Sequence, residues 1–336
     1  MAPGPLLVMG AGSVGCYVGG RLQAAGVDVT YVGRPRVLDA LRANGLTLEA
    51  LDAPAVHLPA RELRLTDGVP SGARPALVIC SVKSGGTAAA AAALEQALPP
   101  GTPVLSLQNG VATVEALQRA APALVPVAGM VPFNVAQIGA GRYRRATSGR
   151  LASADHPAMQ AWQPVFERAG LPLDLHANMR PVQWAKLLLN LNNPVNALSG
   201  LPLREELLDR GYRKVLAALF EEALGVLAAA RIEPAPLLPL PMAWLPRLLR
   251  LPTPLFRIAA SRMLQIDPQA RSSMADDLAL GRSTEIDALC GEIVRLAAGV
   301  SRGAPLNERM SALVLAQSAH PRRWDSKQLR AAMARR

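Results

Sequence analysis

Short apolar runs alternate with helical patterns in the first half of the chain. The run from Pro5 to Gly10 leads into a glycine-rich turn and a helical spacing of apolar residues, and a second run spans Val27 to Val32. Runs at Ala76 to Val82 and Pro103 to Leu107 each precede a loop and a helical segment. This alternation predicts an α/β fold, in which helices cover a parallel sheet.

The pattern changes along the second half. Between Val125 and Leu151 the helical period fades, which predicts hairpins at a sheet edge. After Asn178 five helices are predicted, at Val182 to Leu198, Glu205 to Ala230, Ser273 to Leu280, Thr284 to Ala298 and Asn307 to Ser318. A chain of 336 residues is long for one core. We therefore predict a Rossmann-type, doubly wound domain at residues 1–177 and an all-α substrate or dimerisation domain at 178–336.

Composition narrows the class of protein. Half of the residues are hydrophobic and 18% are charged, which is typical of a globular chain. The three cysteines show neither metal-ligand spacing nor a disulfide framework, so we expect a cytoplasmic protein without a metal. The stretch Pro234 to Pro254 is rich in proline and predicts a flexible lid. Arg247, Arg250 and Arg257 interrupt the apolar run in this region, so no membrane span is expected.

The net charge of +11 fits a nucleic-acid surface, a surface that attracts anionic ligands, or plain arginine-rich composition. Aromatic residues make up only 4% and the arginines are scattered, which disfavours nucleic acid. A phosphorylated cofactor and a carboxylate substrate fit the same charge. Only four of the 36 cationic residues are lysines, among them Lys83 and Lys186. A lysine can release a proton, whereas arginine cannot.

A glycine-rich turn follows the first predicted strand. Gly10, Gly12 and Gly15 form GxGxxG, and the complete turn comprises Gly10, Ala11, Gly12, Ser13, Val14 and Gly15. In this strand-turn-helix context the motif predicts a dinucleotide site, with a merely structural turn as the alternative. Arg34 ends the second strand where NAD enzymes carry a carboxylate, which favours NADPH. The alternative for Arg34 is a solvated loop residue.

Polar residues at the ends of later elements are candidates for catalysis. Lys83 and Asn109 each follow a strand and are expected at the carboxyl edge of the sheet, although each alone is unremarkable. Lys186, Asn190 and Asn193 are spaced as one face of an apolar helix. That polar stripe indicates a ligand or a partner domain, and a buried structural network is the alternative.

Two motifs near the C-terminus complete the set. Ser273 begins a predicted helix, and Glu285 lies in RSTEID, where Thr284 and Asp287 could instead form a helix cap. A carboxylate at Glu285 could meet Lys186 and orient its ammonium group. Reduction of a ketone requires a proton for the developing alkoxide, which a desolvated lysine can supply.

Together these motifs resemble the ketopantoate reductase (2-dehydropantoate 2-reductase) family over nearly the whole chain. They are GAGSVG, Arg34, SVK at Lys83, QNG at Asn109, WAKLLLN at Lys186, SSM and RSTEID. The resemblance implies NADPH as cofactor, Lys186 as general acid and an active site in the cleft between the domains. It implies that Lys83, Asn109 and Glu285 line the cofactor, with Glu285 also near Lys186, and that Asn190 and Ser273 hold the substrate.

The chain departs from the family pattern in one place, because asparagine stands seven residues after Lys186, at Asn193, where eight is common. The residues that bind the far end of the substrate are therefore left open. We expect a small 2-oxo acid as substrate, with ketopantoate as the first candidate. We expect neither nucleic acid nor a membrane as a partner, and a homodimer is possible. The alternatives are a reductase of another branched 2-oxo acid and a non-catalytic dinucleotide sensor, against which the intact Lys186, Asn190 and Glu285 argue.

Overall fold

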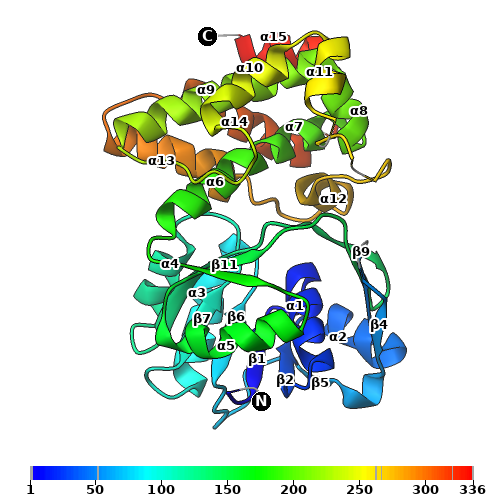
Figure 1. The fold of residues 1–336 in the computed structure, drawn as a ribbon, viewed down its shortest axis with the longest axis vertical. Coiled ribbons are helices and arrows are strands. Elements are labelled where there is room, and N and C mark those ends of the chain that lie inside the picture. The colour runs from blue at the N-terminus through cyan, green and yellow to red at the C-terminus, as the bar shows by residue number, and fades with distance from the viewer. Residues whose placement is uncertain (1–2, 51–52, 262, 266, 320, 335–336) are drawn as a thin grey trace. The chain divides into compact units, whose positions relative to one another are not determined.

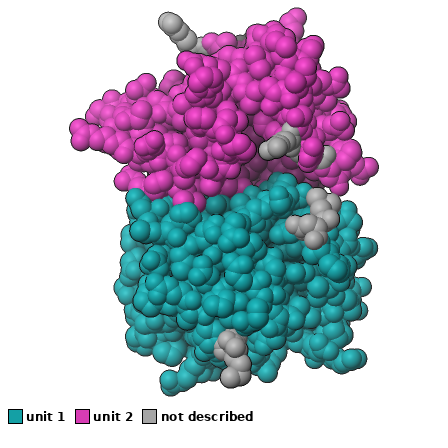
Figure 2. Space-filling model, viewed as in Figure 1, with its two compact units in different colours: residues 1–179 teal, residues 180–336 magenta. Residues whose placement is uncertain are grey.

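The computed structural model describes residues 3–50, 53–261, 263–265, 267–319 and 321–334. The chain divides into two compact units, residues 1–179 (unit 1) and 180–336 (unit 2), which Figure 2 colours separately. The boundary expected at residue 177 lies close to this division. Among the described residues, no helix is both long enough and apolar enough to span a lipid bilayer.

Unit 1 is built on an eight-stranded sheet in the order β12-β11-β8-β7-β6-β1-β2-β5 (Figure 1). Its strands are β1 (Leu6–Met9), β2 (Val29–Val32), β5 (Arg64–Thr66), β6 (Leu77–Cys80), β7 (Pro103–Ser106), β8 (Val125–Met130), β11 (Leu151–Ala154) and β12 (Leu173–His176). All neighbouring pairs are parallel except β8 with β11. Central strands such as β1 are uninterrupted apolar runs because helices cover both of their faces.

Helices pack on both faces of this sheet, which makes it doubly wound as predicted. They are α1 (Ser13–Ala24), α2 (Pro35–Asn44), α3 (Thr87–Ala97), α4 (Thr113–Ala120) and α5 (Pro157–Arg168), with short 3₁₀ turns at Ala60–Glu62 and Ser84–Gly86. Leu6 and Val8 face a core that includes Trp162 of α5. Leu7 faces the other way, into a core that includes Leu94 of α3. Alternate residues of β1 thus anchor two helical layers.

A second, four-stranded sheet was only partly predicted. Its order is β4-β3-β10-β9, from β3 (Leu46–Ala50), β4 (Val56–Leu58), β9 (Val135–Gly139) and β10 (Arg142–Arg145). The antiparallel pair of β9 and β10 confirms a hairpin in this region. The parallel pairing of β10 with β3 was not expected. Glu49 reinforces it through ion pairs with Arg142 at 2.6 Å and Arg144 at 2.7 Å.

The regular secondary structure of unit 2 is entirely helical in its described residues, as predicted. Its elements are α6 (Arg180–Asn190), α7 (Asn192–Ser199), α8 (Leu203–Leu208), α9 (Arg210–Ala229), η3 (Met242–Trp244), α10 (Leu245–Arg250), α11 (Thr253–Ala259), α12 (Ser273–Ala279), η4 (Asp287–Gly291), α13 (Glu292–Gly299), α14 (Pro305–Ala319) and α15 (Ser326–Ala334). The long helix α9 is central, since α7, α8, α10, α13, α14 and α15 all contact it.

Three predicted helices are divided or shortened. The segment Val182 to Leu198 breaks at Leu191, because Pro194 has no N–H for the carbonyl of Asn190 and its ring crowds that carbonyl. The segment Glu205 to Ala230 breaks at Asp209, whose carboxylate caps α9 by accepting a hydrogen bond from Gly211 N at 2.6 Å.

The third case concerns the predicted helix from Thr284. Helical structure begins only at Asp287, with the π-helical turn η4 and not with a capped α-helix. Thr284 therefore lies outside the helix, and the capping alternative for Thr284 and Asp287 is not what the chain adopts.

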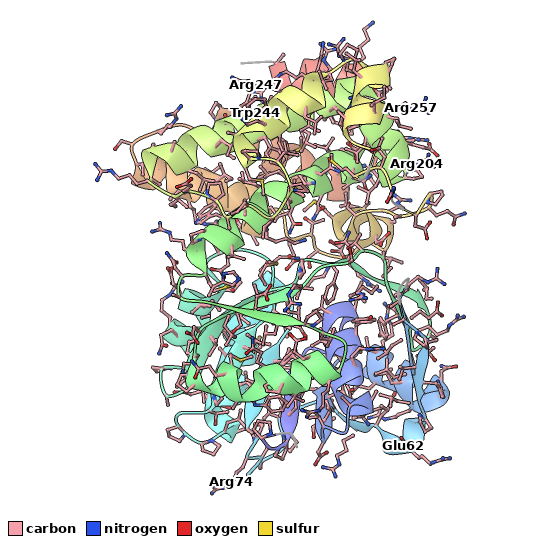
Figure 3. The ribbon with its side chains drawn as sticks, in the orientation of Figure 1. Glu62, Arg74, Arg204, Trp244, Arg247 and Arg257 are labelled. Atoms are coloured by element: carbon pink, nitrogen blue, oxygen red, sulfur yellow. The ribbon has the colours of Figure 1, made fainter. Side chains whose placement is uncertain are left out.

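The stretch predicted as a flexible lid, Pro234 to Pro254, is instead helical and packed over most of its length from Met242 onward. Leu245 and Leu249 of α10 are 2% exposed, and α10 packs on α9. Phe256 of α11 is fully buried, with the Arg213 guanidinium 4.0 Å from its ring centre. Figure 3 labels Trp244 and Arg247 in this segment, and the Arg247 guanidinium lies 5.6 Å from the centre of the Trp244 ring.

Candidate active site

The glycine turn between β1 and α1 is a tightly packed structure. Gly10 N and Ala11 N donate to Val32 O at 3.0 and 2.9 Å, which ties the turn to the end of β2. Gly10 has φ +107°, and a Cβ there would lie 2.8 Å from Val82 N. At Gly15 a Cβ would lie 2.5 Å from Ser81 Oγ. Only glycine fits at these two positions.

The N-terminus of α1 is open to an anion. Gly12 is the N-cap, it is exposed, and a Cβ there would meet nothing within 4 Å. No acidic residue stands in the first turn of α1. The first N–H groups of a helix lack intrahelical partners and carry positive potential. The turn thus fits the pyrophosphate of a dinucleotide.

The end of β2 carries cations and no carboxylate. Arg34 and Arg36 are exposed, and Gly33 packs so closely on the turn that a Cβ there would lie 2.7 Å from Ala11 Cβ. The next acidic residue is Asp39, which forms an ion pair with Arg42 at 2.7 Å. A 2′-phosphate would meet arginine here and no repelling carboxylate, so these residues fit NADPH.

Lys83 and Asn109 follow neighbouring strands, β6 and β7, at the carboxyl edge of the sheet. Buried Gln108 holds the two loops together, since its Nε2 donates to Val82 O at 2.9 Å and to Thr87 Oγ1 at 2.7 Å. This role of Gln108 was not predicted from the sequence. Its only signal was a position beside Asn109 at the end of a buried strand.

Lys186 lies in the middle of α6, between apolar residues of the same helix. Its sequence neighbours Trp184, Ala185, Leu187 and Leu188 are buried, and Lys186 itself is partly buried. Burial lowers the pKa of Lys186 from 10.5 to about 8, because desolvation disfavours the ammonium form. This side chain can therefore release a proton near neutral pH, as a general acid must.

The predicted polar stripe spans two helices. Asn190, 8% exposed, lies one turn after Lys186 at the end of α6. Asn193 lies beyond the break at Leu191, in the first turn of α7, so the three residues do not share one unbroken helix as predicted.

The loop before α12 brings Ser273 to α7. Ser273 is exposed and begins α12. The preceding Ser272 donates through Oγ to Asn193 O at 3.2 Å. Ser273 and Asn193 are thus held in one neighbourhood of unit 2. Glu285 is partly exposed, in the segment between α12 and η4 of the same unit.

A cavity of about 800 Å³ in unit 2 lies beside the segments that carry Ser273 and Glu285. Its lining includes Arg271, Arg282, Arg322 and Arg323, together with residues near the C-terminal ends of α7, α12 and α14. Helix C-termini attract cations, and Arg323 Nε donates to Ser199 O at 3.0 Å. The arginines thus have a role at helix ends, and none of the predicted substrate residues lines this cavity.

The cysteines are not reactive groups. Cys16, Cys80 and Cys290 are free and buried, and burial raises the pKa of Cys16 to about 12 and that of Cys80 to about 11. In the part of the chain that the structure describes, no group of three or more His, Cys, Asp or Glu residues could hold a metal ion.

A doubly wound sheet with an open glycine turn, joined to a helical unit that carries a desolvated lysine, defines the class of nicotinamide-dependent oxidoreductases. The chain belongs to the ketopantoate reductase family. The family model described as ketopantoate reductase PanE/ApbA matches residues 6–158, and the model of the family's C-terminal domain matches residues 178–318. The resemblance seen in the sequence is confirmed.

Individual proteins similar to this chain carry the name of the same family. A 2-dehydropantoate 2-reductase of Pyrococcus horikoshii is 28% identical over 323 residues, covering 93% of this chain and 97% of the relative. The crystal structure of a PanE/ApbA family ketopantoate reductase from Ralstonia eutropha JMP134 is 31% identical, with a TM-score of 0.78, covering 94% of this chain and 98% of that one. A D-mandelate dehydrogenase complex with NADH has the same TM-score at 19% identity and shows only a shared fold.

Proposed function

We propose that this protein reduces 2-dehydropantoate to pantoate with NADPH. The observation that carries the proposal is the Lys186 amine, whose pKa desolvation lowers to about 8, with Asn190 one helical turn later. The glycine turn and Arg34 supply the cofactor side of the reaction. Membership of the ketopantoate reductase family supports the same substrate.

In the proposed binding mode, unit 1 holds the cofactor. The first N–H groups of α1 bind the pyrophosphate, and Arg34 binds the 2′-phosphate. Lys83 and Asn109 line the nicotinamide ribose, on loops that Gln108 keeps together. Bound NADPH supplies the hydride that reduces the 2-oxo carbon.

The groups of unit 2 bind the substrate and supply the proton. Asn190, Asn193 and Ser273 bind its hydroxyl and carboxylate groups through neutral hydrogen-bonding side chains. Lys186 Nζ donates a proton to the oxygen as the carbonyl becomes an alcohol, and the amine is then reprotonated from solvent. Glu285 orients the ammonium group of Lys186 and contacts the cofactor.

The test is oxidation of NADPH by the purified chain with ketopantoate, beside a panel of branched and aromatic 2-oxo acids. We expect the highest kcat/KM for ketopantoate and a clear preference for NADPH over NADH. A higher kcat/KM for another 2-oxo acid would assign the chain to that substrate. Tight NADPH binding without turnover of any 2-oxo acid would favour the dinucleotide sensor.

Two further expectations concern the whole molecule. A homodimer stays a prediction, which light scattering of the purified protein at several concentrations tests. Cytoplasmic location also stays a prediction, which cell fractionation with tagged protein tests.

A further inference from the structure

Helix α7 carries polar side chains on its buried face. Asn196 and Ser199 are both fully buried, as are the neighbouring Val195 and Leu198. Buried amides and hydroxyls cost free energy unless they are hydrogen-bonded, so their partners show what they hold in place. The proposed reaction uses neither side chain.

The amide of Asn196 joins three segments of unit 2. Its Oδ1 accepts a hydrogen bond from Ser272 N at 2.9 Å, and its Nδ2 donates to Leu201 O at 2.9 Å. Ser272 lies 76 residues after Asn196, so this contact is part of the tertiary structure and not a local cap.

Ser272 makes the second link between α12 and α7. It is 2% exposed, and its hydroxyl donates to Asn193 O at 3.2 Å. The same oxygen accepts from Ala275 N at 3.2 Å and so caps α12. Both links reach the residue directly before Ser273, whose exposed side chain is free to turn toward a ligand.

We propose that Asn196 and Ser272 are positioning residues, which hold Ser273 against Asn193 in the geometry that binds the substrate's hydroxyl and carboxylate groups. This inference rests on the proposed function, in which Ser273 and Asn193 bind the 2-oxo acid. Binding groups that are fixed before the ligand arrives lose little entropy when it binds. Freeing the start of α12 therefore weakens substrate binding more than it changes the chemical step.

Ser199 provides a matched control in the same helix. It is fully buried, like Asn196, and its hydroxyl donates to Asn196 O at 2.8 Å and accepts from Leu201 N at 3.1 Å. Both bonds lie within α7 and the turn that follows it. Ser199→Ala thus removes buried hydrogen bonds from α7 without touching the loop before α12.

The kinetic test compares Asn196→Ala, Ser272→Ala and Ser199→Ala. For the first two we expect KM for ketopantoate to rise about tenfold, with kcat and KM for NADPH changed less than about threefold, the pattern of lost ground-state binding. Ser199→Ala should leave all three constants close to those of the wild type. Ser272→Thr keeps the hydroxyl, so it should restore most of what Ser272→Ala loses.

A second measurement does not depend on activity. Hydrogen exchange of the backbone amides at the start of α12 should accelerate in Asn196→Ala and stay unchanged in Ser199→Ala. Unchanged exchange there, or equal effects of Asn196→Ala and Ser199→Ala on every kinetic constant, would overturn the positioning role. A wild-type chain inactive on all 2-oxo acids would overturn the proposed function, while the exchange data would still decide whether Asn196 fixes α12.

Discussion

Replacing Glu206 by glutamine tests how unit 2 accommodates a buried carboxyl group. Glu206 is fully buried in α8, and its Oε2 accepts a hydrogen bond from Asn192 Nδ2 at 3.0 Å. Its Oε1 is buried without a hydrogen-bond partner among the described residues. Burial, and less strongly the charge of Asp209, raises the pKa of Glu206 from 4.5 to about 8.

The raised pKa makes folding stability depend on pH. Between pH 4.5 and about 8 the folded state keeps the Glu206 proton that the unfolded state releases. The stabilisation is therefore complete below pH 4.5 and is lost as pH rises through about 8. This pKa difference corresponds to at most about 5 kcal/mol, since each pH unit contributes about 1.4 kcal/mol.

Glutamine at this position cannot ionise. We expect the free energy of unfolding of Glu206→Gln, minus that of the wild type, to increase by several kcal/mol between pH 5 and pH 8.5. In a unit of this size each kcal/mol moves Tm by about 2 to 4 °C, so the difference in Tm should change by roughly 5 to 10 °C. If the amide itself destabilises the fold by an amount that does not vary with pH, the whole difference curve shifts and its dependence on pH stays the same.

The assay is differential scanning calorimetry of both proteins at several pH values, following the transition that the substitution displaces. Glu205→Gln is the control, because this neighbour in α8 is exposed and loses the same charge. Its difference curve should be nearly flat. A flat curve for Glu206→Gln over the same range would refute a protonated, buried Glu206.

Further predictions concern the proposed active site. Lys186→Arg should lower kcat about 10²- to 10⁴-fold while KM for NADPH stays within about threefold, because arginine keeps the charge but cannot give up the proton; near-full turnover would exclude Lys186 as the acid. In the wild type, kcat for reduction should fall as pH rises through about 8, where Lys186 loses its proton, and a stopped-flow pH profile checks this. Arg34→Ala should raise KM for NADPH about tenfold or more and leave KM for NADH nearly unchanged, as steady-state kinetics with both cofactors would show. Gly15→Ala should abolish NADPH binding in a fluorescence titration, since the added methyl group would lie 2.2 Å from the backbone oxygen of Gly10, whereas Gly12→Ala, in open space, should bind more weakly but measurably.

Much of unit 1 is readable from local sequence patterns. The apolar runs that became β1, β2, β6 and β7 are buried on both faces, and the glycine turn has the spacing that its geometry requires. The break at Leu191 was also readable, because Pro194 stands four residues after Asn190. The prediction of one continuous helix overlooked this proline.

Other features depend on partners that are distant in the sequence, so no local pattern reveals them. In the sequence Asn196 is one polar residue among many. Only the fold brings Ser272, 76 residues later, into hydrogen-bond contact with its amide. Gln108 joins two loops through Val82 and Thr87, more than 20 residues earlier in the chain. The proline-rich stretch resembled a loop, but Phe256 could be buried against Arg213 because α9 offers a surface that only the folded unit shows.

The pairing of β3 with β10 has a consequence for biosynthesis. Glu49 binds Arg142, a residue translated 93 positions later, so the small sheet cannot close until that part of the chain has left the ribosome. During this interval the hairpin of β3 and β4 presents an unpaired edge on which another nascent chain could pair. Newly made chains should therefore pass through an aggregation-prone stage that ends when β10 docks.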